Sequence, residues 1–213
     1  MKGLFITFEG TEGSGKSTQI ALAAERLRRD GFSVLALREP GGTLIGESIR
    51  AVLKDPANAA MTPETELLLM NASRAQLVRE RILPALDAGQ IVLCDRFADS
   101  TVAYQAFGRG LDAASVDQVI QFATGGLVPR LTILLAAPVA LSEARLRARS
   151  SDSPGAADRL EAAGQAFFER VEQGFERLAA LAPDRVKRVD AAGSIEEVRA
   201  RIWSEIATVL PPG

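Results

Sequence analysis

A glycine-rich segment near the amino terminus has the residues and the spacing needed to hold phosphate groups. Gly10 to Ser17 matches the pattern G-x-x-x-x-G-K-[ST] and lies between a strand-like run and a helix-like run. The glycines let successive backbone N–H groups turn toward phosphate oxygens, and the start of the helix adds the positive end of its dipole. The residues predicted to bind ATP are Gly10, Thr11, Glu12, Gly13, Ser14, Gly15, Lys16, Ser17 and Thr18.

Within this segment, two side chains are expected to do chemistry. Lys16 should reach the β- and γ-phosphates, and the hydroxyl of Ser17 should ligate Mg²⁺. Asp95, at the end of the apolar run 91–94, stands where a P-loop sheet places its acidic magnesium partner. The predicted metal ligands are therefore Ser17 and Asp95.

Arg96 directly follows that carboxylate. An arginine in this place favours a second anion opposite ATP, which would be the phosphate of an acceptor molecule. The alternative is that Asp95 and Arg96 form an ordinary ion pair on the surface at the end of a strand.

Composition limits the chemistry that the chain can use. Its 213 residues carry a net charge of −2 with a pI near 5.4, so no overall positive field exists to hold nucleic acid or an anionic membrane. One cysteine, Cys94, and no histidine exclude a disulfide framework, a Cys/His zinc site and histidine-based catalysis. Strand-like sequence begins by Leu4 and no apolar run is long enough to span a bilayer, so we expect a cytoplasmic protein.

The elements that must position these residues are visible as short apolar runs between longer amphipathic segments. The alternation predicts an α/β fold, a single P-loop NTPase domain over residues 1–213 with three layers: a five-stranded parallel sheet, helices on both faces and a short lid. The lid is expected at about residues 142–160, where a stretch rich in Ser, Gly, Pro and Ala interrupts a basic helix. The predicted strands are 4–8, 34–37, 91–94, 131–135 and 186–189.

Helix capping signals support this reading. Pro63 follows Thr62 at a predicted helix start, and Ser194 with Glu197 forms a capping box before the last helix. Gly31 stands where a left-handed residue would end the first helix.

Taken together, these pieces resemble the bacterial thymidylate kinase family along nearly the whole chain. The family phosphorylates dTMP to dTDP, so the resemblance implies a nucleoside monophosphate kinase that uses ATP and dTMP with Mg²⁺ and forms a homodimer. The matching pieces are residues 8–18, 38–43 (Arg-Glu-Pro-Gly-Gly-Thr), 74–76, 95–97, Ser100, Tyr104 with Gln105, and 158–159.

The resemblance also implies roles for polar residues at the acceptor. Arg38 and Arg96 would hold the monophosphate, which suits the bidentate hydrogen bonds of a guanidinium. Glu12 would contact the sugar 3′-hydroxyl and help to organise the phosphate end, or else it simply points to solvent.

By the same resemblance, Arg74 would bind the edge of thymine, with Met70 where the family usually stacks a phenylalanine on the base. Met70 could equally be a core residue. Tyr104 would lie beneath the deoxyribose and exclude a ribose 2′-hydroxyl, or be a buried structural tyrosine. The remaining predicted dTMP-binding residues are Ser100 and Thr101, near the ring, and Gln105.

Four arginines around the predicted lid resemble those that neutralise charge on the transferring phosphoryl group. They are Arg145, Arg147, Arg149 and Arg159, and we expect Arg149 and Arg159 to do so, with the others on a solvated helix face. The predicted catalytic residues are then Lys16, Arg96, Glu12, Arg149 and Arg159.

Two other functions fit part of this pattern. A deoxynucleoside kinase shares the P-loop and the sheet, but it phosphorylates a sugar hydroxyl and needs a base, whereas two arginines suit an acceptor phosphate. A P-loop switch or regulated ATPase would bind nucleotide without making a product. The chain contains no Asn-Lys-x-Asp element for reading guanine, which argues against a GTPase switch.

Overall fold

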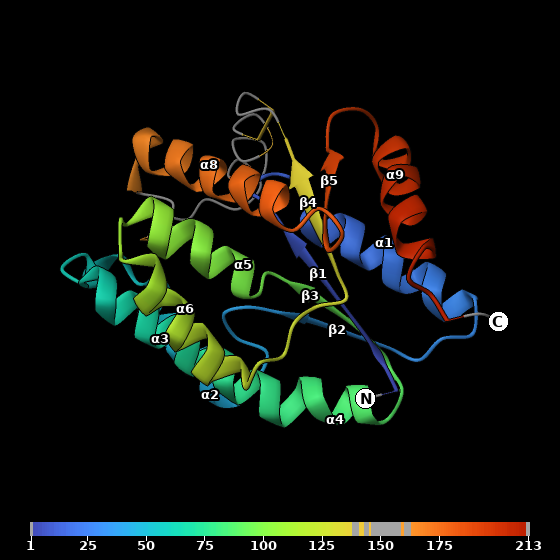
Figure 1. Ribbon diagram of the computed structural model, residues 1–213, viewed down its shortest axis with the longest axis horizontal. Helices are drawn as coiled ribbons and strands as arrows, with labels where there is room; N and C mark the ends of the chain where they lie inside the picture. Colours follow the sequence, from blue (N-terminus) through green and yellow to red (C-terminus); the bar gives the residue numbers. More distant parts are fainter. Residues whose placement is uncertain (1, 138–140, 143–144, 146–158, 160–162, 212–213) are drawn as a thin grey trace.

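Five parallel strands form the centre of the protein, as the sequence predicts. The computed structural model describes residues 2–137, 141–142, 145, 159 and 163–211. The strands lie in the order β2-β3-β1-β4-β5 (Figure 1). Their bounds are β1 Leu4–Glu9, β2 Val34–Arg38, β3 Ile91–Asp95, β4 Leu131–Ala136 and β5 Val186–Asp190.

Helices connect the strands and cover both faces of the sheet, which confirms the predicted three layers (Figure 1). A short 3₁₀ turn lies at Pro56–Asn58, and two π-helical segments, Val78–Ile82 and Val102–Gly108, extend α3 and α5. The described α-helices are α1 Lys16–Arg29, α2 Leu44–Lys54, α3 Pro63–Leu77, α4 Leu83–Asp87, α5 Ala98–Thr101, α6 Ala113–Thr124, α8 Gln165–Leu181 and α9 Ile195–Ala207.

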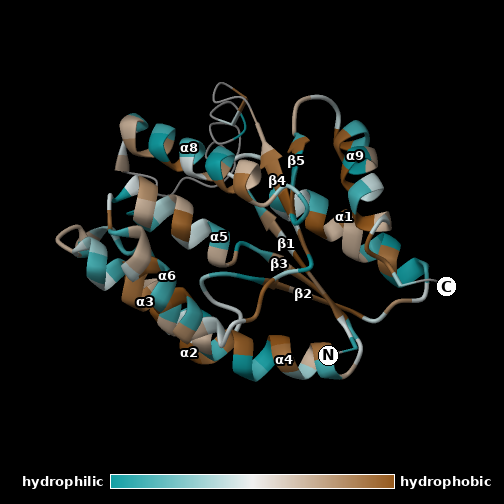
Figure 2. Cartoon of the chain, in the orientation of Figure 1, coloured by the Kyte–Doolittle hydropathy of each residue, from teal (hydrophilic) through white to brown (hydrophobic). Residues whose placement is uncertain are grey.

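Alternate residues of the strands enter different hydrophobic clusters, because successive side chains of a strand point to opposite faces. Ile6 and Phe8 of β1 pack with α1 and α9 on one face. Phe5 packs on the other face with the end of α3 and with α4, while α8 covers that face beside β4 and β5. Figure 2 shows the strands as predominantly hydrophobic ribbons between helices of mixed character.

The capping signals are found where the sequence predicts them. The Thr62 side chain accepts a hydrogen bond from the Thr65 backbone N–H at the start of α3, and Ser194 and Glu197 form a complete capping box at α9. Gly31, just after α1, has φ of 92°, the left-handed conformation expected of a helix stop.

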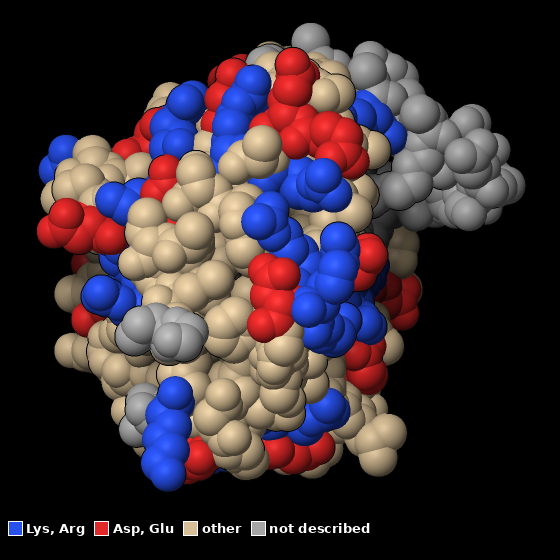
Figure 3. Space-filling view, turned by 90° about the vertical axis from the view of Figure 1, so that its right-hand side faces the viewer, with Lys and Arg blue, Asp and Glu red and all other residues tan. Residues whose placement is uncertain are grey.

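The carboxyl ends of the strands gather at one edge of the sheet. The register pairs Arg38 and Phe8 with Asp95, so the ends of β2, β3 and β1 lie together. Ligands of open α/β sheets bind outside this edge. The face of the molecule in Figure 3 carries Lys and Arg side chains interspersed with Asp and Glu side chains.

Leu27 offers a test of the packing between α1 and the sheet. Its side chain is 0% exposed and lies within the cluster formed by α1, α9 and the strands. Replacing Leu27 with Ala is expected to lower the free energy of unfolding by about 2 to 5 kcal/mol, through lost burial and a residual cavity. Urea denaturation followed by circular dichroism measures this, and a change below about 0.5 kcal/mol would contradict the packing described.

Candidate functional site

The glycine-rich loop joins the end of β1 to the start of α1. Gly10, Gly13 and Gly15 have φ of 131°, 74° and 96°, and a Cβ on Gly10 would lie 2.5 Å from the Leu135 carbonyl oxygen. Gly15 provides no side-chain cap for α1, so a bound phosphate could accept hydrogen bonds from the N–H groups of the first turn. The loop therefore has the backbone that a phosphate cradle requires.

Lys16 lies folded into this loop and is only 7% exposed. Its Nζ donates to the carbonyl oxygens of Gly10 and Thr11, at 3.0 and 2.8 Å, and to the Ser14 hydroxyl at 3.3 Å. Burial, followed by the positive charge of Arg96, lowers the pKa of Lys16 to about 7. A phosphate beside Nζ would offset both effects and favour the charged ammonium.

Ser17 and Asp95 form the pair predicted to bind magnesium. The Ser17 hydroxyl donates to Asp95 Oδ2 at 3.1 Å, while Oδ1 of the same carboxylate has no hydrogen-bond partner among the described residues. Mg²⁺ commonly takes one or two protein oxygens and completes its shell with phosphate and water. A hydroxyl next to an under-used carboxylate fits that pattern.

Arg96 is held over the same region by polar side chains. Its Nη1 donates to the Ser100 hydroxyl at 3.1 Å, and its Nη2 donates to the Tyr104 hydroxyl at 3.1 Å and faces Glu12 at 3.5 Å. Burial alone would lower the pKa of Arg96, but Tyr104, Glu12 and Asp95 together raise it above its ordinary value. The guanidinium is therefore a permanent positive charge beside the phosphate loop.

A cavity of about 560 Å³ brings these groups together with most of the other predicted residues. Gly10 and Thr11 are not among its lining residues, although both belong to the loop. The predicted site residues that line the cavity are Glu12, Gly13, Ser14, Gly15, Lys16, Ser17, Thr18, Arg38, Met70, Arg74, Asp95, Arg96, Ser100, Thr101, Tyr104 and Gln105.

Arg38 lines this cavity with an exposed side chain that already has an anionic partner. Its Nη2 donates to both carboxylate oxygens of Glu47, at 2.9 and 2.8 Å. An acceptor phosphate would have to share or replace this exposed pair, which costs little in water.

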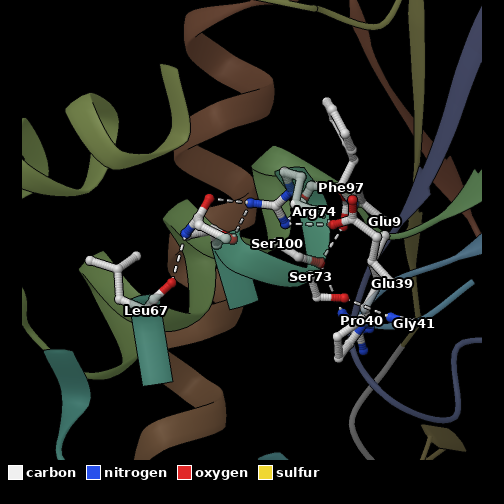
Figure 4. Close-up of polar contacts among 12 residues, drawn as sticks. Glu9, Glu39, Pro40, Gly41, Leu67, Ser73, Arg74, Phe97 and Ser100 are labelled. Atoms are coloured by element: carbon white, nitrogen blue, oxygen red, sulfur yellow. Dashed lines mark hydrogen bonds and ion pairs between the residues drawn. The ribbon is translucent and has the colours of Figure 1, made fainter. Parts of the chain in front are cut away.

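Arg74, predicted to bind the base, lines the cavity but is only 2% exposed. Figure 4 shows its guanidinium joined to the Glu39 carboxylate. Each N–H of its guanidinium has an acceptor: the Glu39 carboxylate, Asn71, Thr101 and the Phe97 carbonyl oxygen. A thymine edge could therefore gain a hydrogen bond from Arg74 only by sharing or displacing one of these acceptors.

Met70 and Gln105, two further predicted side chains, also line the cavity. Met70, one turn before Arg74, is half-buried and lines the cavity, so it is not a core residue. The Gln105 side chain donates to Glu66 at 2.9 Å.

The structure does not bring Arg159 to the cavity. Its Nε donates to the Leu53 carbonyl oxygen at 3.0 Å, and its Nη2 binds Glu66 at 2.6 Å, beyond the cavity lining. Arg145 instead lines the cavity and donates to the carbonyl oxygens of Ser14 and Ala191, each at 3.3 Å. Arg147, Arg149 and most of the predicted lid lie outside the described residues.

Sequence reasoning missed two buried carboxylates beside the site. Glu39 binds Arg74, and Glu9 accepts hydrogen bonds from the residues that follow Arg96. One feature of the sequence could have identified Glu9 as a site residue: it is acidic, and it lies between an apolar strand and the phosphate loop. Glu39 lies within the matched Arg-Glu-Pro segment, but nothing in its spacing predicts the contact with Arg74.

Comparison with known proteins gives one consistent result. A family model described as thymidylate kinase matches residues 8–202. The thymidylate kinase of Synechococcus sp. (strain JA-2-3B'a(2-13)) is 50% identical over 210 residues, which cover 98% of this chain and 96% of the relative. That of Geotalea uraniireducens is 46% identical over 212 residues, with 99% and 100% covered.

A solved structure is similar along the whole chain as well. The crystal structure of thymidylate kinase from Ehrlichia chaffeensis superposes with a TM-score of 0.77 and 31% sequence identity, over 97% of this chain and 99% of that one. Among the described residues, no helix is both long enough and apolar enough to cross a membrane.

Proposed function

The chain belongs to the thymidylate kinase family, and on this premise we propose that it transfers the γ-phosphoryl group of ATP to dTMP, giving dTDP and ADP for dTTP synthesis. One observation carries the proposal: a single cavity is lined both by the phosphate loop with Lys16 and by the two arginines, Arg38 and Arg96. Two phosphate-binding groups in one cavity suit a donor and an acceptor that are both phosphorylated.

ATP would occupy the side of the cavity formed by the loop and the start of α1. Its β- and γ-phosphates would accept hydrogen bonds from loop N–H groups and from Lys16, which would have to leave its contacts with the loop carbonyls. Arg145, Ala191 and Ile195 line the neighbouring wall and would contact the nucleoside. Ser17 and Asp95 would hold Mg²⁺, which when bound neutralises charge on the phosphate oxygens.

dTMP would occupy the opposite side. Its phosphate would lie against Arg96 and Arg38, its sugar against Glu12 and Tyr104, and its base between Met70 and the wall around Arg74. Ser100, Thr101 and Gln105 complete this wall.

Transfer would be a direct in-line attack of a dTMP phosphate oxygen on the γ-phosphorus. That oxygen is already ionised at pH 7, so the reaction needs no general base. Lys16 and Arg96 would stabilise the charge that develops on the transferring group, because both are hydrogen-bond donors with little exposure to solvent.

We further propose that residues 1–213 form one kinase domain that works as a cytoplasmic homodimer. Exposed apolar side chains support a second copy: Leu68 on α3 is 59% exposed and Phe122 on the adjoining α6 is 84% exposed. Analytical ultracentrifugation measures the mass in solution, and a monomer at micromolar concentration would contradict the dimer.

A panel of acceptors tests the proposed reaction. With ATP and Mg²⁺, dTMP is expected to give the highest kcat/KM, and dUMP a value about 10- to 200-fold lower, because a methyl group in a pocket contributes roughly 1 to 3 kcal/mol. Thymidine should give no product, since it lacks the phosphate that the arginines bind. Coupled detection of ADP measures these rates. Phosphorylation of thymidine in preference to dTMP would identify a nucleoside kinase, and ATP hydrolysis unaffected by any acceptor would identify an ATPase.

A further inference from the structure

The turn that carries Arg96 has a backbone conformation that needs external support. Arg96 has φ of 70°, and among the described residues it is the one non-glycine residue with positive φ. Left-handed backbone costs a residue with a Cβ roughly 1 to 2 kcal/mol. Such a conformation persists only where surrounding contacts enforce it, so the contacts of this turn show what fixes the direction of the guanidinium.

Glu9 supplies the contacts from the side of β1. Its Oε1 accepts a hydrogen bond from the Phe97 backbone N–H at 2.8 Å, and its Oε2 accepts one from the Ser100 hydroxyl at 2.5 Å. The same hydroxyl accepts a hydrogen bond from Nη1 of Arg96. One carboxyl group therefore holds the backbone immediately after Arg96 and, through Ser100, the guanidinium itself.

A second set of contacts holds the carbonyl group of Phe97, the residue whose N–H is bound by Glu9. The Phe97 carbonyl oxygen accepts a hydrogen bond from Arg74 at 2.9 Å, and Arg74 is bound in turn by Glu39. Figure 4 shows Arg74 joined to the Glu39 carboxylate, with Glu9, Phe97 and Ser100 nearby. The two sets fix the turn from both sides, but only Glu9 connects it to the Arg96 side chain.

Glu9 is 0% exposed and is not part of the cavity lining, so it touches neither substrate site. Burial, followed by the nearby charge of Asp99, raises the pKa of Glu9 to about 8. Burial of a carboxyl group is costly, and both oxygens of Glu9 bind the segment just after Arg96. Glu9 is therefore better suited to fixing the conformation of this turn than to supplying a charge.

We infer that Glu9 is a positioning residue for the acceptor phosphate: its hydrogen bonds to Phe97 and Ser100 hold the left-handed turn that directs the Arg96 guanidinium into the cavity. This inference rests on the proposed function, in which Arg96 binds dTMP. It goes beyond that function because it explains the orientation of the Arg96 guanidinium by a residue outside the cavity, Glu9.

Steady-state kinetics of Glu9 variants test the inference. Glu9→Ala is expected to raise the KM for dTMP about tenfold or more and to leave the KM for ATP within about twofold, because a displaced guanidinium affects only the acceptor. Glu9→Gln should keep both KM values within about threefold, since the amide can accept from the Phe97 N–H and donate to Ser100. Rescue by Gln together with a selective loss in Ala is a pattern that general destabilisation does not produce.

Two further variants complete the design. Glu9→Asp keeps the carboxyl group but retracts its oxygens, and it is expected to raise the KM for dTMP about fivefold; it decides the matter if Glu9→Ala does not fold. Leu27→Ala is the control for lost stability, and its KM values should match those of the parent. An unchanged KM for dTMP in Glu9→Ala or Glu9→Asp would overturn the inference, as would an equal rise for ATP. A parent protein inactive on dTMP would instead overturn the proposed function.

Discussion

Replacing Lys16 with Ala is expected to lower kcat by on the order of 10³-fold while the protein remains folded. The estimate follows from the effect of removing one preorganised donor of transition-state charge stabilisation. Nζ of Lys16 donates to two loop carbonyl oxygens and to the Ser14 hydroxyl. These three acceptors are two backbone oxygens and a neutral hydroxyl, so the loss should fall on phosphoryl transfer and not on folding.

Single-turnover kinetics with saturating ATP and dTMP measure this effect, and circular dichroism checks the fold. Lys187→Ala is the matched control, because Lys187 is a partly exposed lysine on β5 whose Nζ contacts only the Pro183 carbonyl oxygen among the bonds described. Its rate should equal that of the parent. A Lys16→Ala protein with a near-normal rate would remove Lys16 from the mechanism.

Replacing Arg96 with Ala should have an effect of similar size but of a different kind. We expect kcat/KM for dTMP to fall by on the order of 10²- to 10³-fold, because a charged donor to phosphate is lost from a partly buried position. The affinity for ATP should change far less. Arg96→Lys should recover only part of the loss, because an ammonium cannot form the paired hydrogen bonds of a guanidinium.

The affinities for the two substrates show whether Arg96 binds the acceptor phosphate or supports the whole site. Isothermal titration of dTMP and of an ATP analogue into each variant measures the two affinities, with Arg188→Ala as a control on an exposed ion pair with Glu176. Equal losses for both ligands would show that Arg96 supports the site in general. An unchanged affinity for dTMP would remove Arg96 from the proposed acceptor site.

The strands could be predicted almost completely, and the error in their ends has a physical cause. Each predicted run stops one residue before the strand does, since an apolar run ends at the first polar or small residue, whereas β pairing continues. Four of the five added residues are charged: Glu9, Arg38, Asp95 and Asp190. The hydrophobic pattern therefore does not predict the last residue of each strand, at the edge of the sheet where the site lies.

The cavity could be predicted in its composition but not in its internal contacts. Local spacing identifies the phosphate loop, because the loop is contiguous and its chemistry is set by neighbours in sequence. Glu39 and Arg74 are 35 positions apart in the chain, and Glu9 and Ser100 are 91 apart. Such pairs are made by the fold, and the spacing of residues along a single chain does not predict them.

The arginine expected to reach the transferring phosphoryl group illustrates the same limit. Arg145 and Arg159 have the same type and flank the same segment, but Arg145 contacts the phosphate loop while Arg159 pairs with Glu66, whose side chain is 1% exposed. The charge of the two residues and their positions in the sequence therefore do not distinguish the one that contacts the phosphate loop. The fold distinguishes them, because it places Arg159 beside the buried carboxylate of Glu66 in α3.

Simultaneous binding of both substrates is the most direct measurement of the central claim. Titration of dTMP into protein saturated with Mg²⁺ and a non-hydrolysable ATP analogue should show one dTMP per chain, with an affinity within about tenfold of that for the free protein. If the analogue and dTMP displaced each other, the cavity would hold one nucleotide at a time, and direct phosphoryl transfer between them would be contradicted.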